Sequence, residues 1–478
     1  MMSKSIVKHF SMIGAGTLVS MILGLVTTPI ITRVVNTVEY GKYSVFVMYA
    51  NIAVVVLMVG LDQAYLRYFY KAEQTDENNK LFYRCTFIPF LSAIGLGVLL
   101  CVASAIVPQY FEFKTEIMVM LSLYTVSLVL LKQIQLTARL KYKTKVYSSL
   151  AVADKAIYIA VVMIAIFGLG CKSLAAMAFS ITVAALITVL LGFLILRKDL
   201  AFNCGKVSCV NVRELVAYGF PFVFSMGLTV LFQSVDKLCL KIFTDYSDIG
   251  VYKSAESMIN VFAIIQTTFN ALWMPLALKK YEEEPENKKF HKDGNEIITL
   301  LMITFGATVI VFKDLLVYWL GPDFREAAMV LPALVFNPVM YTISETTVVG
   351  IVFSKKSHLH IVVALVACIA NVAGNLLLIP LVGIRGAAIS TGFAYVLFFV
   401  MRSVLGKKYY STGAPIGKCI FVAILTFLYA LFSMFTNFGI LNIVLYSALI
   451  ICIFTLYKNK VKFVFEYVRN KFSVLKGD

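Results

Sequence analysis

The stretch 232–255 places an acid and two bases near the end of an apolar segment. They are Asp236, Lys237 and Lys241, and a polar turn follows them before a second apolar segment begins. A charge at the centre of a bilayer costs about 2.5–3.5 kcal/mol on insertion scales, so it usually faces a partner or a wet cavity. These residue types therefore indicate a site that handles a polar or charged solute inside a membrane.

Twelve candidate residues of this kind are distributed over both halves of the sequence. Lysine and arginine could hold a pyrophosphate through charge-assisted hydrogen bonds, and asparagine amides could bind sugar hydroxyls. We expect the set to line a hydrated central cleft that suits an anionic ligand. The candidates are Arg33, Asp62, Arg67, Lys132, Asp154, Asp236, Lys237, Lys241, Glu256, Glu345, Asn371 and Asn375.

Structural roles compete with this interpretation at each position. Adjacent acids and bases, such as Asp154 with Lys155, would neutralise each other between helices. Residues at the edges of spans would extend their charged ends to the headgroups. The two asparagines could equally serve packing between helices. For the set as a whole we favour the hydrated cleft.

A repeated motif divides the chain. Glu39-x-Gly41-x-Tyr43 recurs 209 positions later (39 to 248) as Asp248-x-Gly250-x-Tyr252. A repeat in one orientation predicts two parallel lobes about an axis normal to the membrane. We predict an N-terminal lobe over residues 1–205, a C-terminal lobe over residues 206–410, and two further spans with a basic tail over residues 411–478.

The composition requires an all-α integral membrane protein. Of the 478 residues, 60% are hydrophobic and 14% are charged, whereas soluble domains contain roughly 25% charged residues. A helix of about 20 apolar residues crosses the hydrocarbon core, and a helix satisfies its own backbone hydrogen bonds there. We predict fourteen spans, roughly 10–32, 43–66, 85–108, 116–138, 146–169, 173–196, 215–243, 251–278, 296–319, 327–353, 359–381 and 386–404, with two more within 419–457.

The net charge of +17 fits a membrane topology better than nucleic-acid binding. Most of the 43 basic residues fall in alternate loops and at the two ends of the chain. The positive-inside rule then places both termini in the cytoplasm. No basic stripe on a nucleic-acid-binding fold accompanies the charge, so we expect no nucleic-acid partner.

Soluble-enzyme chemistry has little support in the sequence. The nine cysteines form no Cys-x-x-Cys pair, so neither a disulfide framework nor a metal site is predicted. The outer loops are short, whereas a membrane polymerase or ligase for glycans would present a large catalytic outer loop. We expect a transporter rather than an enzyme, with no cofactor beyond a coupling ion, H⁺ or Na⁺.

Several segments together resemble bacterial polysaccharide flippases. Each segment is moderately specific, and the similarity extends over essentially the whole chain. The segments are Asp236-Lys237 leading to Gly250-Val-Tyr252 with Ala255; Leu320-Gly-Pro-Asp-Phe324 with Ala327; Asn371-Val-Ala-Gly-Asn375 through Pro380; Gly383-Ile-Arg-Gly-Ala-Ala388; and Gly60-Leu-Asp62 with Arg67.

The resemblance implies the superfamily of polysaccharide flippases, lipid II flippases and multidrug exporters. It implies two six-helix lobes in a V shape, working by alternating access in the bacterial cytoplasmic (inner) membrane. The cargo would be an undecaprenyl-pyrophosphate-linked oligosaccharide for lipopolysaccharide O-antigen, capsule or exopolysaccharide. Membrane lipids, a polysaccharide polymerase and chain-length proteins would be its partners. The implied pyrophosphate ligands are Arg33, Arg67, Lys132, Lys237 and Lys241.

The alternative on the same fold is a cation-coupled multidrug exporter. Such a pump needs an acid that exchanges a proton or sodium ion against a cationic drug. The first span, 10–32, contains no acid, although Asp62 and Asp154 remain available in the first lobe. We therefore favour the flippase.

Overall fold

The computed structural model describes residues 4–71, 75–197, 199–200, 210–356, 358–463 and 466. Helices make up nearly all of this part, and it contains no β-strand, so the predicted all-α fold is confirmed. The chain divides into two compact units, Met1–Lys237 and Leu238–Asp478. The predicted lobe boundary at 205/206 lies outside the described residues, as do Cys204 and Cys209, and the three-part division stays a prediction.

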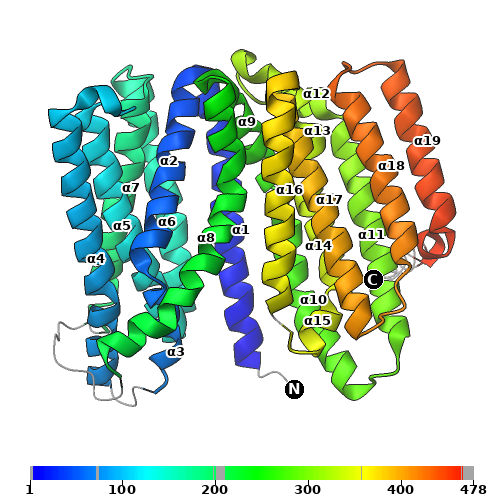
Figure 1. Ribbon diagram of the computed structural model, residues 1–478, viewed down its shortest axis with the longest axis horizontal. Helices are drawn as coiled ribbons and strands as arrows, with labels where there is room; N and C mark the ends of the chain where they lie inside the picture. The colour runs from blue at the N-terminus through cyan, green and yellow to red at the C-terminus, as the bar shows by residue number, and fades with distance from the viewer. Residues whose placement is uncertain are drawn as a thin grey trace, which may run out of the picture. The chain divides into compact units, whose positions relative to one another are not determined.

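The first unit is a bundle of long helices (Figure 1). Within it α5 packs on α4 and α7, and α6 packs on α1 and α7. The last helix, α8, continues beyond Lys237 into the second unit. The elements are α1 Lys4–Thr32, α2 Thr37–Met58, α3 Leu61–Tyr68, α4 Thr75–Ile106, η1 Pro108–Tyr110, α5 Thr115–Leu140, α6 Thr144–Met163, the π-helical η2 Ile164–Gly168, α7 Leu174–Ile195 and α8 Val212–Phe243.

The second unit is also helical, and several of its spans are broken into short pieces. The helices α16 and α17 form a long hairpin, α17 packs on α14, and α11 packs on α14, α18 and α19. The elements are α9 Tyr246–Asn260, α10 Ala263–Glu283, α11 Lys288–Val311, α12 Lys313–Val317, η3 Pro322–Met329, α13 Leu331–Leu334, α14 Phe336–Thr347, α15 Val349–Phe353, α16 His358–Val382, α17 Ile384–Tyr409, α18 Ile416–Met434 and α19 Ile440–Leu456.

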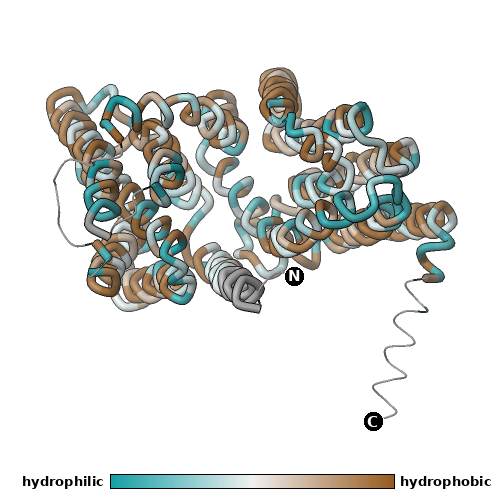
Figure 2. The backbone as a smooth tube through the Cα atoms, turned by 90° about the horizontal axis from the view of Figure 1, so that it is seen from below, coloured by the Kyte–Doolittle hydropathy of each residue, from teal (hydrophilic) through white to brown (hydrophobic). Residues whose placement is uncertain are grey.

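Hydrophobic residues cover much of the helices in both units (Figure 2). Among the described residues, ten helices are long and apolar enough to cross a membrane, or up to twelve if each of two bent pairs is one span. Two shorter apolar helices, Gly16–Thr32 and Ile440–Leu456, match the first and last predicted spans. Every predicted span therefore has a helical counterpart, while the count of fourteen and the cytoplasmic termini stay predictions.

The repeated motif begins one helix in each unit. The Asn36 side chain accepts a hydrogen bond from the Glu39 backbone N–H at 2.8 Å and caps α2. The Asp245 side chain accepts one from the Asp248 backbone N–H at 3.1 Å and caps α9. Asparagine and aspartate are favoured at this position because their oxygens satisfy an N–H that the helix leaves open. Residues 209 positions apart therefore occupy equivalent places at the starts of α2 and α9.

Two glycines bring backbones into direct contact within the first unit. Gly60 separates α2 from α3 and has φ +68°, in the left-handed region. A Cβ atom on Gly60 would lie 2.0 Å from the carbonyl oxygen of Gly219 on α8. This break sets the start of α3 and so the position of Asp62.

Gly60→Ala is expected to lower the free energy of unfolding by about 2–4 kcal/mol, because the left-handed backbone and the steric overlap each carry a cost. Chemical unfolding in detergent, followed by circular dichroism, measures the change. Gly227→Ala on α8 is the control, since a Cβ atom there meets no atom within 4 Å. Equal stability of both variants would contradict the close contact.

Candidate functional site

Asp62 and Lys132, both predicted candidates, form an ion pair in the first unit. Lys132 Nζ on α5 lies 3.0 Å from Asp62 Oδ2 in the first turn of α3. The Gln63 side-chain amide donates to the same oxygen at 3.0 Å. Asp62 Oδ1 is buried and has no hydrogen-bond partner within the described part of the chain. The pair therefore compensates the charge of Asp62 through one carboxylate oxygen.

Neutral hydrogen bonds fix the helices around this pair. The Tyr65 hydroxyl and Thr137 Oγ1 lie 3.1 Å apart and join α3 to α5. The Gln133 side-chain amide donates to the Cys85 carbonyl oxygen at 3.2 Å and joins α5 to α4. Both contacts are buried within an apolar cluster that includes Leu61. The carboxylate of Asp62 is thus surrounded by buried and mostly apolar side chains of α3, α4 and α5.

The two charged ends of the pair differ in exposure. The Asp62 side chain is 3% exposed, whereas the Lys132 side chain is 36% exposed. A second pair of candidates shows the same order on α6, where Asp154 is 21% exposed and Lys155 is 43% exposed, with 3.5 Å between Oδ2 and Nζ. In both pairs the amine is the more accessible group, so each pair presents a positive end.

Both lysines lie inside their spans, away from the helix ends. Lys132 lies eight residues before the end of α5 at Leu140, and Lys155 lies eleven residues after the start of α6 at Thr144. At 1.5 Å per residue these positions are about 12 Å and 17 Å from the helix ends that meet at the α5–α6 loop. The hydrocarbon core is about 30 Å thick, so these distances place both residues inside their spans, with Lys155 closer to the middle of its helix than Lys132.

The remaining charged candidates have different surroundings. Asp236 and Lys237 on α8 are buried, and Lys241 on the same helix is half-buried. Glu256 forms an ion pair with Lys253 one turn earlier on α9, at 2.9 Å.

Arg33, just after α1, and Arg67, in the last turn of α3, are exposed. The prediction that all twelve candidates line one cleft stays a prediction.

The two candidate asparagines lie in a polar cluster inside the second unit. Asn371 and Asn375 on α16 are fully buried, and Asn375 Nδ2 lies 3.5 Å from Asn371 Oδ1. Thr391 on α17 donates to Asn371 Oδ1 at 3.5 Å and contacts the Tyr252 hydroxyl of α9 at 3.3 Å. The cluster therefore links three helices, which agrees with a packing role as well as with ligand binding.

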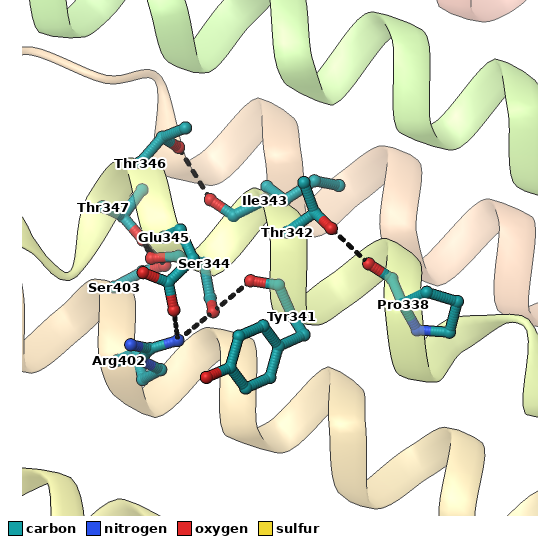
Figure 3. A network of polar contacts seen from close by, with 10 residues as sticks. All are labelled: Pro338, Tyr341, Thr342, Ile343, Ser344, Glu345, Thr346, Thr347, Arg402 and Ser403. Carbon is teal, nitrogen blue, oxygen red and sulfur yellow. Dashed lines mark hydrogen bonds and ion pairs between the residues drawn. The ribbon is translucent and has the colours of Figure 1, made fainter. Parts of the chain in front are cut away.

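Glu345 has a partner that the sequence analysis missed. Arg402 on α17 donates from Nη1 to Glu345 Oε1 and to Ser344 Oγ on α14, both at 2.7 Å (Figure 3). The guanidinium also lies over the rings of Tyr341, at 5.2 Å, and Phe398, at 5.1 Å. Both charged side chains are less than one-tenth exposed. Glu345 is thus part of a buried ion pair between α14 and α17.

One signal in the sequence could have identified Arg402. An acid inside a span needs a counter-charge, and Glu345 has no basic residue within nine positions on either side. The predicted span 386–404 places Arg402 two residues from its end, where a basic residue is typical of the edge of a span. In the structure α17 continues to Tyr409, which places Arg402 about two turns inside the helix.

The fold matches solved transporter structures over most of their length. The lipid II flippase MurJ in an inward closed conformation aligns with a TM-score of 0.69 and 14% identity, over 94% of this chain and 99% of that one. An outward-facing MATE-family multidrug resistance transporter of the MOP superfamily gives 0.55 and 14%, over 84% and 95%. A MOP superfamily transporter from Pyrococcus furiosus gives 0.55 and 13%, over 85% and 95%. The chain therefore has the fold that these flippase and transporter structures share.

A family model described as polysaccharide biosynthesis protein matches residues 6–279, which is more than half of the chain. The chain belongs to this family, as the resemblance of its motifs predicted. An uncharacterized membrane protein of Methanocaldococcus jannaschii is 22% identical over 228 residues. That match spans 46% of this chain and 45% of the relative's length.

Proposed function

We propose that the protein is a flippase that moves an undecaprenyl-pyrophosphate-linked oligosaccharide from the cytoplasmic to the outer leaflet by alternating access. Its membership of the polysaccharide biosynthesis protein family supports a glycan as cargo. The likeness of its fold to a lipid II flippase supports a lipid-linked form of that glycan. The lipid tail would stay in the bilayer while the head group crosses between the helices.

The observation that carries the proposal is the partly exposed side chain of Lys132 inside a span. An ammonium group turned toward lipid at this depth would cost several kcal/mol, so its exposed side must meet water or a polar ligand. The side chain of the paired acid is 3% exposed, whereas that of Lys132 is 36% exposed. An anion is therefore the ligand that this side of the pair attracts, and pyrophosphate is the anionic group of the proposed cargo.

The finer features of the proposal follow from this cargo. The protein would work in the cytoplasmic membrane of a bacterium, with both termini in the cytoplasm and without a cofactor. The lipid-linked oligosaccharide would be an O-antigen, capsule or exopolysaccharide unit. A polymerase and chain-length proteins would use the unit after its transfer.

Transfer by the purified protein tests the proposal. In vesicles, an undecaprenyl-pyrophosphate-linked oligosaccharide with a fluorescent tag is bleached by a membrane-impermeant reagent wherever it reaches the outer leaflet. We expect the protein to raise the bleached fraction above that of protein-free vesicles. A similarly tagged phosphatidylcholine should show no increase.

The MATE likeness favours one second candidate, a cation-coupled multidrug exporter. Proton-driven efflux of ethidium from the same vesicles, with no transfer of the tagged glycolipid, would replace the proposed function by this one. Transfer of the glycolipid without ethidium efflux would exclude it.

A further inference from the structure

The helix α14 is buried in the second unit except at two residues of one face. Ten of its twelve residues are buried, and Asn337 and Tyr341 are half-buried. The two residues lie four positions apart, so their side chains project from the same face of the helix. Both belong to the middle of the predicted span 327–353. An amide and a phenol ring are therefore the only side chains of α14 that a ligand can contact.

Two aromatic rings of α17 lie beside Tyr341 and are half-buried as well. The Phe398 ring is stacked with the Tyr341 ring, with 5.6 Å between the ring centres and 16° between the ring planes. The Tyr395 ring meets the Phe398 ring at 64°, with 6.3 Å between their centres. We call the three rings and the Asn337 amide the aromatic shelf. The shelf lies deep within the membrane, since both of its α17 rings are near the middle of that helix.

The aromatic shelf lies on the side of α17 that is turned away from lipid. The exposed apolar residues of α17 are Phe393, at 51%, and Val404, at 54%. At about 100° per residue, Tyr395 and Phe398 lie about 120–180° from both of them around the helix. This opposite side is the one that packs against α14, as the stacking of Phe398 with Tyr341 shows. The accessible part of the shelf therefore belongs to the interior side of α17 and not to its lipid-facing side.

The Asn337 amide has unused hydrogen-bonding capacity at this depth. It is not fully buried, and it forms no hydrogen bond with the described part of the chain. An amide without a partner in apolar surroundings is unfavourable, so water or a polar ligand must meet it. The charges beside the shelf are already compensated, because Arg402 pairs with Glu345 and its guanidinium lies over the Tyr341 ring (Figure 3). The shelf thus combines aromatic faces with a free amide and presents no uncompensated charge.

We propose that the aromatic shelf binds a sugar ring of the cargo, as a glycan site separate from the pyrophosphate contact of Lys132. The inference rests on the proposed function, because that function supplies the glycan. A pyranose ring carries C–H groups on a flat face and hydroxyl groups around its rim. The C–H face packs on aromatic rings, whose faces carry partial negative charge. The Asn337 amide donates to one hydroxyl group and accepts from another.

A cationic drug fits the aromatic shelf less well than a sugar does. Aromatic faces attract cations, but the Arg402 guanidinium already lies 5.2 Å from the centre of the Tyr341 ring and 5.1 Å from that of Phe398. A second cation on these rings would be repelled by the guanidinium. Glu345 cannot offset this repulsion, because its charge is paired with Arg402. A neutral ligand with hydroxyl groups is therefore the chemical class that the shelf favours.

Saturation-transfer NMR with the untagged oligosaccharide of the transfer assay, released from its lipid carrier, tests the site directly. The full-length protein in detergent is irradiated at its aromatic protons, and sugar protons in contact with the rings gain signal. We expect this signal on the ring C–H groups of at least one sugar. Phe398→Leu removes one ring and keeps an apolar side chain, so it should lower the signal by about 3- to 10-fold. Phe393→Leu, on the opposite side of α17, is the matched control and should keep the wild-type signal.

Two further variants separate loss of the site from loss of the fold. Asn337→Leu removes the amide without breaking a hydrogen bond in the described part of the chain, so it should lower the sugar signal while stability is retained. Phe398→Tyr restores an aromatic ring and should recover most of the signal that Phe398→Leu loses. Chemical unfolding in detergent measures the stability of each variant.

The outcomes distinguish the inference from the function on which it rests. Equal sugar signals from wild type, Phe398→Leu and Asn337→Leu would overturn the glycan site and leave the flippase proposal standing. Transfer of the glycolipid without any sugar signal would do the same, and so would ethidium binding at these rings in place of the sugar. Absence of both transfer and sugar signal would overturn both proposals. Loss of signal in Phe398→Leu and Asn337→Leu, but not in Phe393→Leu, would establish the site.

Discussion

Arg402→Met is expected to lower the free energy of unfolding by about 3–5 kcal/mol, because it leaves Glu345 buried without its counter-charge. The substitution also removes the hydrogen bond to Ser344 and the contacts of the guanidinium with two aromatic rings. Both tryptophans of the chain, Trp273 and Trp319, belong to the second unit. Tryptophan fluorescence during chemical unfolding in detergent therefore reports on the unit that contains the pair.

Arg385→Met is the matched control on the same helix. The Arg385 guanidinium lies 4.9 Å from the centre of the Phe435 ring and is half-buried, so its loss should cost less than about 1 kcal/mol. The double variant Glu345→Gln with Arg402→Met removes both charges and should recover much of the loss. If the single and double variants were equally unstable, packing rather than charge would account for the effect.

Hydrophobic runs were sufficient to predict the spans, because length and composition decide which helices can cross a bilayer. Breaks within spans were harder to predict. The predicted span 43–66 is divided into α2 and α3 at Val59 and Gly60, both in the left-handed region. Gly60 tolerates this conformation. The break in the span also depends on the backbone contact between Gly60 and Gly219, which lie 159 positions apart (60 to 219). A single sequence does not show such a contact.

The capping role of the repeated motif was accessible from the sequence but was not recognised. Asn36-x-x-Glu39 and Asp245-x-x-Asp248 each place a capping residue three positions before an acid, which is typical of a helix start. Glu39 also accepts a hydrogen bond from the Leu174 backbone N–H, at 2.6 Å, at the start of α7. Glu39 thus has a structural role, and the two capping residues explain the spacing of the motif without a ligand.

Pairing of charges between helices depends on tertiary packing. Asp62 and Lys132 are 70 positions apart (62 to 132), and each was predicted only as a charge that needs a partner or a wet surface. The structure shows that Asp62 and Lys132 are partners and that the Lys132 side chain is also partly exposed. The sequence alone does not show which of the two side chains is more exposed. This difference decides which of them can contact an anion.

Lys132→Gln is expected to reduce transfer of the tagged glycolipid by about 10- to 100-fold. A hydrogen bond to a charged group contributes about 1.5–3 kcal/mol, and each 1.4 kcal/mol corresponds to a factor of ten. Initial rates in vesicles that contain equal amounts of protein measure the effect. Lys145→Gln is the control, because Lys145 is exposed in the first turn of α6 and outside the proposed site.

The double variant Asp62→Asn with Lys132→Gln separates loss of the amine from damage to the fold. It leaves no buried charge without a partner, so its stability should approach that of wild type. Its transfer rate should stay as low as that of Lys132→Gln, since the amine that would meet the pyrophosphate is absent from both. Recovery of transfer in the double variant would show that the amine only neutralises Asp62, and the anion-binding role of Lys132 would then be wrong.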